Sequence, residues 1–245
     1  MTASMNYIDG LQSLRATDFF FVKQHKSLVE ALTGYQPASK FSIFNRESQL
    51  LFNAYEESTC CQRCWCTNSR ELVLHIMDTA NNEVIRMTRA LKCCCVCCWC
   101  GDCNSCKQEM IIESPPGTVI GSVNHEESRC RMRYTLRDAN RTNMMGIIGP
   151  RCICDGPYSC CCESEFAIIG TDGETKIGAI QKQYGGYCTE AFTSADSFTL
   201  EGHYSQECCF FIVVPMNLDA KMKAVGLGAL FLIEFMCFVY KPNNS

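Results

Sequence analysis

The most constraining feature of this sequence is an almost unbroken apolar run of 17 residues near the C-terminus, Ala224–Tyr240. Its length is at the lower limit for a helix that spans a hydrocarbon core of about 30 Å. Nine Leu, Ile, Phe or Val residues contribute about −3 to −5 kcal/mol to insertion, whereas an ionised Glu234 costs about 2.5–3.5 kcal/mol. Two placements therefore stay open: a single membrane span, or a helix buried along the axis of a soluble β-barrel.

Cysteine is the second unusual feature, with 22 residues in the chain. Met1–Gly10 has no basic start followed by an apolar stretch, so we expect a cytosolic chain whose thiols stay reduced. Adjacent cysteines are also poorly placed for orderly disulfide pairing. The densest group runs from Cys93 to Cys106, and its thiols remain available for metal binding, lipidation or packing.

Three interpretations of this group stay open. One is a metal cluster, because four of the cysteines have a C-x2-C-x2-C-x2-C spacing that misses only the last interval and the proline of an iron–sulfur motif. Another is acylation, because several adjacent thioester-linked chains make a stable membrane anchor. The third is a loop without a ligand. The spaced cysteines are Cys97, Cys100, Cys103 and Cys106, and the candidate acylation sites are Cys93, Cys94, Cys95, Cys97 and Cys98.

Most of the chain before the C-terminal run has the pattern of a β protein. Short apolar runs are separated by turn residues, and Asp172-Gly173 between two of them is a good hairpin signal. This pattern predicts an antiparallel sheet that forms a barrel or a sandwich. Earlier in the chain, apolar residues at helical spacing predict an amphipathic helix over Asp18–Tyr35. The roughly ten expected strands are 41–44, 49–55, 71–77, 83–87, 110–112, 118–123, 131–136, 144–148, 166–169 and 176–180.

No repeat or linker divides the chain, so we expect one domain. Its parts are a short N-terminal segment (1–17), a β domain (18–223) with a cysteine-rich loop (92–106), a hydrophobic helix (224–240) and a short tail (241–245). The net charge of −4 argues against nucleic-acid binding, and seven prolines form no arm for proline-reading partners. The four histidines stand apart and no catalytic motif occurs, so we predict no catalytic residues and no enzyme.

Several motifs together resemble the phospholipid scramblase family. The run Cys93–Cys98 is similar to the family's palmitoylated motif, and Leu218–Val225 and Phe231–Met236 are similar to its C-terminal segment. The resemblance covers roughly residues 9–241. Further matching motifs in the same order are Leu28–Gly34, Ser114–Gly117, Ile148–Pro150 and Glu190–Thr193.

The resemblance implies a mostly β fold, a tubby-like closed antiparallel barrel around the C-terminal hydrophobic helix. It also implies Ca²⁺-activated, ATP-independent, bidirectional movement of membrane phospholipids between leaflets, with covalent palmitate. The implied location is the plasma membrane, as a single-pass protein with a cytoplasmic N-terminal body. Because one helix encloses no groove for a polar headgroup, we expect a homo-oligomer whose helices line a path past Glu234.

The resemblance also places a Ca²⁺ loop over residues 194–219. Ser194 and Asn217 stand where the family has acidic residues, and the segment fails the EF-hand pattern. We expect a weak site, with Kd on the order of 10⁻⁴ to 10⁻³ M, and a polar loop that holds no metal is the alternative. The candidate ligands are Asp196, Glu201, Asn217 and Asp219.

Two other functions stay open beside lipid movement. One is a membrane-tethered, tubby-like module that binds lipid or a protein partner and moves no lipid. The other is a metal-cluster protein, which visible absorbance or a metal analysis would reveal.

Overall fold

The fold is described from a computed structural model. It covers residues 11–25, 37–66, 69–92, 103–126, 131–151, 165–183 and 209–238, and the side chains of Cys64, Trp65 and Gln183 are not described.

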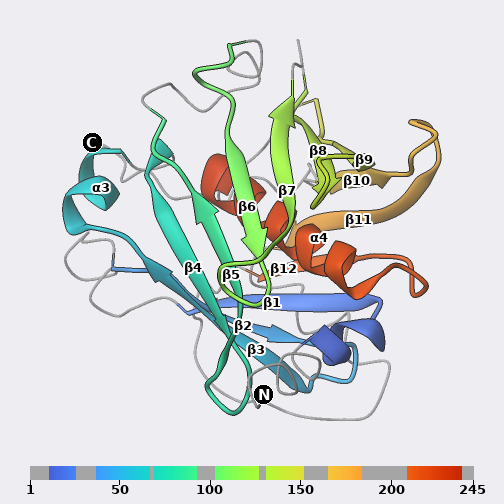
Figure 1. The fold of residues 1–245 in the computed structure, drawn as a ribbon, viewed down its shortest axis with the longest axis horizontal. Coiled ribbons are helices and arrows are strands. Elements are labelled where there is room, and N and C mark those ends of the chain that lie inside the picture. Colours follow the sequence, from blue (N-terminus) through green and yellow to red (C-terminus); the bar gives the residue numbers. More distant parts are fainter. Residues whose placement is uncertain are drawn as a thin grey trace.

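Twelve antiparallel strands in this part of the chain form one closed barrel. Each strand pairs with its neighbour in sequence, and β1 pairs with β12 to close the sheet (Figure 1). The barrel predicted from the motifs is therefore confirmed. The strands are β1 (Phe19–His25), β2 (Lys40–Phe44), β3 (Leu50–Glu57), β4 (Leu72–Met77), β5 (Glu83–Arg89), β6 (Glu109–Glu113), β7 (Val119–Glu126), β8 (Arg133–Asp138), β9 (Asn143–Ile148), β10 (Glu165–Ile169), β11 (Lys176–Gln183) and β12 (Cys209–Val213).

Alternation along the strands explains why they form a barrel with a filled interior. In β4, Leu72, Leu74 and Ile76 are fully buried, while the residues between them are partly exposed. The predicted Asp172-Gly173 hairpin joins β10 to β11, with Gly173 at a φ of 76° that favours glycine. Oδ1 of Asp172 accepts hydrogen bonds from the backbone N–H groups of Glu174 and Thr175, which stabilises the turn.

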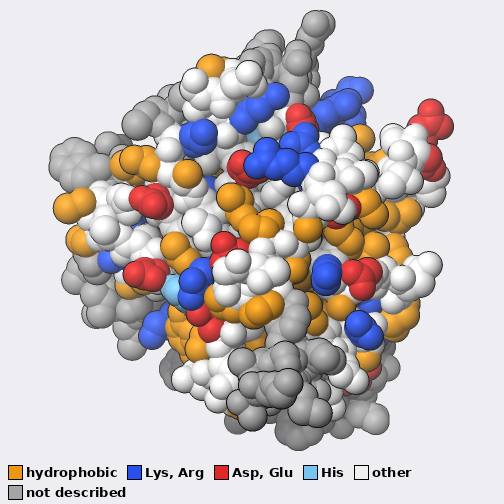
Figure 2. Space-filling model, in the orientation of Figure 1, with side chains coloured by type: hydrophobic (Ala, Val, Ile, Leu, Met, Phe, Trp, Pro, Cys, Tyr) orange, Lys and Arg blue, Asp and Glu red, His pale blue; other side chains and the backbone are white. Residues whose placement is uncertain are grey.

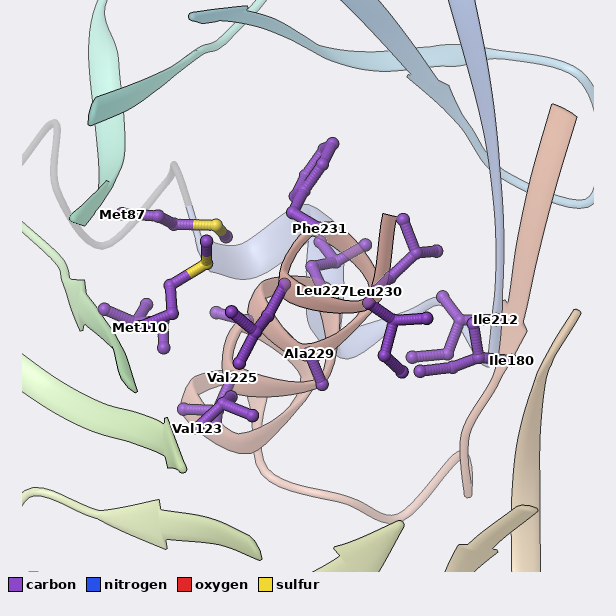
Figure 3. Packing of buried hydrophobic residues seen from close by; sticks show 14 of the residues in the cluster. Met87, Met110, Val123, Ile180, Ile212, Val225, Leu227, Ala229, Leu230 and Phe231 are labelled. Atoms are coloured by element: carbon purple, nitrogen blue, oxygen red, sulfur yellow. The ribbon is translucent and has the colours of Figure 1, made fainter. Parts of the chain in front are cut away.

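The C-terminal helix occupies the barrel axis. Helix α4 (Ala220–Ile233) continues directly as a π-helical segment, η3 (Glu234–Phe238). Thirteen of the fourteen α4 residues are buried because strands surround the helix, and beyond Lys223 every side of α4 is apolar. In Figure 3, Met87, Met110 and Val123 approach the helix from one side and Ile180 and Ile212 from the other.

Of the two placements open for Ala224–Tyr240, the described part of that run adopts the buried axis of a barrel. The single membrane span is not confirmed. Among the described residues, we find no helix with both the length and the hydropathy needed to cross a bilayer.

The helix predicted over Asp18–Tyr35 is wrong for its first part, because Phe19–His25 is strand β1. Phe20 and Val22 point into the core, while Phe19 stacks on Phe211 at 5.8 Å and Phe21 lies 6.3 Å from Phe44 on the outer face. Since both faces carry apolar residues, the two-residue period of the strand was hidden in the sequence. Residues 26–35 lie outside the described ranges.

Strand β12 was also missed, because its five residues lie within the segment taken as a single Ca²⁺ loop. With β1 and β12 added, the barrel has two more strands than the roughly ten expected.

The two ends of the barrel differ in their connections. Antiparallel pairing places all tight hairpins at one end, the short-turn end, together with the N-terminus of α4. The connections β1–β2, β3–β4, β5–β6, β7–β8, β9–β10 and β11–β12 all leave from the opposite end, the long-connection end. All cysteines except Cys209, at the start of β12, and Cys237, in η3, belong to these connections.

Candidate functional site

A band of polar side chains lies inside the barrel at the long-connection end, around η3. We call it the polar layer. Its members come from β3 to β8 or from the residue positions just before β4 and β6, and none exposes more than 6% of its surface. They are Glu56, Arg70, Arg89, Gln108, His125 and Tyr134.

The strongest contact in the polar layer is a buried ion pair. Arg70 Nε and Nη2 donate to the two carboxylate oxygens of Glu56 at 2.7 and 3.1 Å. Ser58 Oγ donates to one of these oxygens and the Ser39 backbone N–H donates to the other. Burial alone would raise the pKa of Glu56, but these hydrogen bonds and the charge of Arg70 lower it from 4.5 to about 2.

Arg89 lies beside this pair without a carboxylate of its own among the described residues. Its Nε and Nη2 donate to the backbone oxygen of Arg70 at 3.2 and 2.8 Å. Its side chain is fully buried; burial and then the charge of Arg70 lower its pKa to about 9. The guanidinium groups of Arg70 and Arg89 lie 4.9 and 5.8 Å from the ring centre of Phe235, on η3.

The other half of the polar layer is uncharged or aromatic. His125 on β7 pairs with Tyr134 on β8, with ring centres 5.5 Å apart. The Tyr134 hydroxyl lies 3.8 Å from Cys237 Sγ, and burial raises the pKa of Tyr134 well above its ordinary value. Across the barrel, the Lys182 ammonium lies 4.1 Å from the ring centre of Phe238.

Glu234 is the first residue of η3, at the point where the helix changes from α to π. It is 3% exposed. The structure places Glu234 inside the barrel, and the prediction that it belongs to a membrane helix is not confirmed. The position of Glu234 along the barrel axis is near the long-connection end, where the polar layer lies, since α4 runs from the short-turn end to the long-connection end.

The candidate acylation residues Cys93–Cys98 lie outside the described residues. The chain on either side of them is described. Lys92 donates its backbone N–H to the Ser69 oxygen at 3.2 Å, and Cys103 is exposed. Cys106 is disulfide-bonded, which the expectation of uniformly reduced thiols did not anticipate.

The calcium prediction is only partly covered by the structure. Asp196 and Glu201 lie outside the described residues, while Asn217 and Asp219 are exposed in the turn between β12 and α4. Strand β12 separates the two pairs, so the four residues do not belong to one loop as we had expected. Within the described ranges, no group of three or more His, Cys, Asp or Glu residues is arranged to hold a metal ion.

The polar layer was not predicted from the sequence. The available signal was a polar residue in phase with the apolar residues of a strand. Arg89 is in phase with Ile85 and Met87, and Glu56 with Phe52 and Ala54. From the sequence alone, such a charged residue can equally be interpreted as the exposed position at which the strand ends, because charged residues are common at strand ends. The closure of the barrel is what makes Arg89 an interior residue.

Comparison of the sequence with protein families and with individual known proteins gives the same result: both point to the scramblases. The profile of the Scramblase family matches residues 1–240. The chain is 36% identical over 243 residues to mouse phospholipid scramblase 1, covering 98% of this chain and 67% of that protein. Human phospholipid scramblase 1 is 36% identical over 236 residues, covering 96% and 67%. Human phospholipid scramblase family member 5 is 32% identical over 234 residues, covering 94% and 77%.

The chain spans about two thirds of the length of the first of these relatives. No solved structure matches it.

Proposed function

This chain belongs to the scramblase family, and on that basis we propose that it moves phospholipids between membrane leaflets without making or breaking covalent bonds. The observation that carries the proposal is the family match over residues 1–240, together with relatives that are named phospholipid scramblases. We further propose that the movement is bidirectional, activated by Ca²⁺ and independent of ATP.

The geometry of the barrel restricts the route that a lipid can take. A crossing headgroup needs polar partners throughout the hydrocarbon region, because hydrocarbon cannot solvate it. The barrel interior is occupied by α4, whose Gly228 lies so close to β6 that an added Cβ would approach Ile112 at 2.8 Å. While α4 stays in place, the route we propose lies outside the barrel, along its surface or between copies in a homo-oligomer.

Membrane attachment is proposed through palmitate on Cys93, Cys94, Cys95, Cys97 and Cys98. These residues lie in the β5–β6 connection, which leaves the barrel at the long-connection end. Several acyl chains are needed for stable attachment, because one chain alone binds only marginally. Hydroxylamine treatment of membranes should therefore release the protein, and replacing these cysteines by Ala should prevent membrane binding. Retention after both changes would reject acylation as the anchor.

Calcium activation is proposed to act at the start of α4. Asp219 is the N-cap residue of this helix, and its side chain makes no capping hydrogen bond, so its carboxylate is available to a cation. Asn217 lies two residues earlier and is also exposed. A cation at this turn would act on the segment that holds α4 in the barrel.

The decisive experiment measures the transfer of a fluorescent lipid in liposomes of defined composition that contain the purified, acylated protein. We expect Ca²⁺ to accelerate transfer without ATP, and Asp219→Asn to reduce the effect of Ca²⁺ at least several-fold. Glu47→Gln is the matched control, because Glu47 is an exposed carboxylate at the same end of the barrel. An unchanged Ca²⁺ response in Asp219→Asn would reject the role of this turn.

A second candidate function is favoured by the burial of α4. With its hydrophobic helix enclosed, the barrel is suited to act as a membrane-tethered module that binds lipid or a protein partner and moves no lipid. The same liposomes distinguish the two functions. Protein that binds the liposomes while the labelled lipid stays in its leaflet would establish the tethered module and reject the scramblase.

A further inference from the structure

Two arginines, Arg70 and Arg89, are buried in the polar layer, and Glu56 is the carboxylate whose charge acts on Arg89. Glu234, the other buried carboxylate at this end, is not among the charges that shift the pKa of Arg89. Both oxygens of Glu56 are already occupied by Arg70, Ser39 and Ser58. Arg89 is therefore a buried guanidinium next to a second one, in surroundings where an uncompensated charge is costly.

Unused hydrogen-bonding groups accompany this charge. In the part of the chain that the structure describes, Arg89 Nη1 has no hydrogen-bond partner, and neither do Nε2 and Oε1 of Gln108. Arg89 is 0% exposed and Gln108 2% exposed, so bulk water does not replace these partners. Buried polar groups in folded proteins nearly always have a hydrogen-bond partner. A buried group without a protein partner therefore indicates a bound water, ion or ligand.

The two side chains are neighbours across the sheet. Arg89 lies directly opposite Met110, and Gln108 precedes Met110 by two residues, on the same face of the sheet. The backbone oxygen of Gln108 accepts the His125 N–H at 2.8 Å, which continues the β6–β7 ladder to this residue. Diagonal neighbours of this kind are within reach of long side chains, so one small ligand can contact both.

Arg89 and Gln108 both lie at the long-connection end of the barrel. Arg89 is the last residue of β5 and Gln108 immediately precedes β6, so they flank the connection that carries Cys93–Cys98. On the outer surface, Lys and Arg side chains gather over the ends of β6, β7 and β8 at this end (Figure 2). Lys107, Arg131 and Arg133 lie in these positions. Glu126 lies among them, 3.9 Å from the Lys107 ammonium, so the basic groups are in excess, and such an excess raises the local concentration of anions.

We propose that Arg89 and Gln108 form a binding site for a phosphate group, supplied either by a phospholipid headgroup or by free phosphate. The headgroup source rests on the proposed function, and the free-phosphate source does not. Arg89 Nη1 and Gln108 Nε2 donate to phosphate oxygens. Gln108 Oε1 needs a donor, which is the P–OH group of free phosphate or the ammonium group of a serine or ethanolamine headgroup.

The test compares thermal unfolding of the purified chain in sodium phosphate and in sodium chloride of equal ionic strength. At a tenfold excess of ligand over Kd, we expect phosphate to raise Tm by about 3–6 °C more than chloride does. Gln108→Glu places a carboxylate beside Arg89, so this variant should have a higher Tm without phosphate and should lose the response to phosphate. Arg89→Met should lose the response as well.

Arg46→Gln is the matched control, because it removes an arginine that is 60% exposed at the short-turn end. It should keep the wild-type response. Equal Tm values for wild type in phosphate and chloride, with no shift in glycerophosphoethanolamine either, would overturn the proposal and leave water as the occupant. A phosphate response that persists in both Gln108→Glu and Arg89→Met would overturn it too.

The source of the phosphate is decided by two further measurements. A shift with glycerophosphoethanolamine, and weaker sedimentation of Gln108→Glu than of wild type with phosphatidylserine vesicles, identify the lipid headgroup. A shift with inorganic phosphate and equal sedimentation of both proteins identify free phosphate. If wild type shows the phosphate shift but moves no lipid in liposomes, the proposed function fails while this site stands.

Discussion

Glu56 is the residue on which the polar layer depends most directly, because its buried carboxylate pairs with Arg70. Its folded-state pKa of about 2 lies below the ordinary value of 4.5, so the pair contributes stability above pH 4.5 and loses it as the pH falls toward 2. From this difference we expect the free energy of unfolding to fall by about 2 kcal/mol between pH 6 and pH 3. Urea denaturation at a series of pH values measures it.

Glu56→Gln should remove this pH dependence and destabilise the protein at pH 7 by about 3–5 kcal/mol, because the buried Arg70 then loses the carboxylate charge of Glu56. Glu47→Gln, at an exposed position, is the control and should retain the dependence. A Glu56→Gln variant with the pH profile of wild type would show that other carboxylates govern acid unfolding.

Lys223 fastens the start of α4 to the N-terminal segment. Its side chain is fully buried, and Nζ donates to the backbone oxygens of Arg15, Thr17 and Met216 at 2.9, 2.8 and 2.9 Å. Burial lowers the pKa of Lys223, and the charge of Asp18 opposes this shift.

Lys223→Met should destabilise the protein by about 3 kcal/mol, because three buried or partly buried carbonyl groups lose a charged donor. Lys221 lies two residues earlier on the exposed side of the helix. Lys221→Met should therefore change the free energy of unfolding by no more than about 0.5 kcal/mol. Chemical denaturation compares the two variants, and equal effects would mean that the three hydrogen bonds add no stability.

At the scale of the element, two glycines of α4, Gly226 and Gly228, differ in how closely the barrel packs against them. A Cβ on Gly226 would meet its nearest atom, in Ile212, at 3.4 Å, whereas a Cβ on Gly228 would meet two atoms of Ile112 at 2.8 and 2.9 Å. Alanine gains about 1 kcal/mol over glycine in a helix, and overpacking a core costs about 1–3 kcal/mol. The surroundings decide which contribution is larger at each position.

We therefore expect Gly226→Ala to be neutral or stabilising and Gly228→Ala to be destabilising by about 1–2 kcal/mol. Larger residues separate the two placements of the helix more clearly. Gly228→Leu should prevent the barrel from closing around α4, which loss of the cooperative unfolding transition would report. A stable, cooperatively folded Gly228→Leu protein would contradict the buried placement.

At the scale of the whole molecule, the barrel closes only when β1 pairs with β12, so the first and the last strand complete the sheet together. Helix α4 is then surrounded by strands on all sides (Figure 1). Its backbone amides can exchange with solvent only when the barrel opens. This enclosure distinguishes α4 from a surface helix, whose turns open locally.

Hydrogen exchange in detergent-free buffer should accordingly show the amides of α4 among the slowest in the protein. Their opening free energy should match the global free energy of unfolding from denaturation. The outer hairpin at 170–175 provides the fast internal reference, because its residues 171–175 are exposed. Amides of α4 that exchange as fast as this hairpin would contradict a helix enclosed in a closed barrel.

Most of the barrel could be predicted from the sequence because a half-exposed strand has a local signature. Alternation in runs such as Leu72–Met77 and the turn at Asp172-Gly173 depend only on neighbouring residues. Strands β1 and β12 could not be recognised in this way. Apolar side chains lie on both of their faces, so they have no period of two to detect.

The sequence by itself predicted that the apolar run from Ala224 is a helix hidden from water, because no face of it is polar, and the structure bears this out as far as Phe238. The sequence did not determine whether lipid or protein surrounds this helix. Protein surrounds it here because twelve strands close around it, and that closure depends on the whole chain. The same closure turned Arg70, Arg89 and Gln108 from strand-end residues into a buried layer. Local sequence reports hydrophobicity and period, whereas burial depends on contacts between residues far apart in the chain.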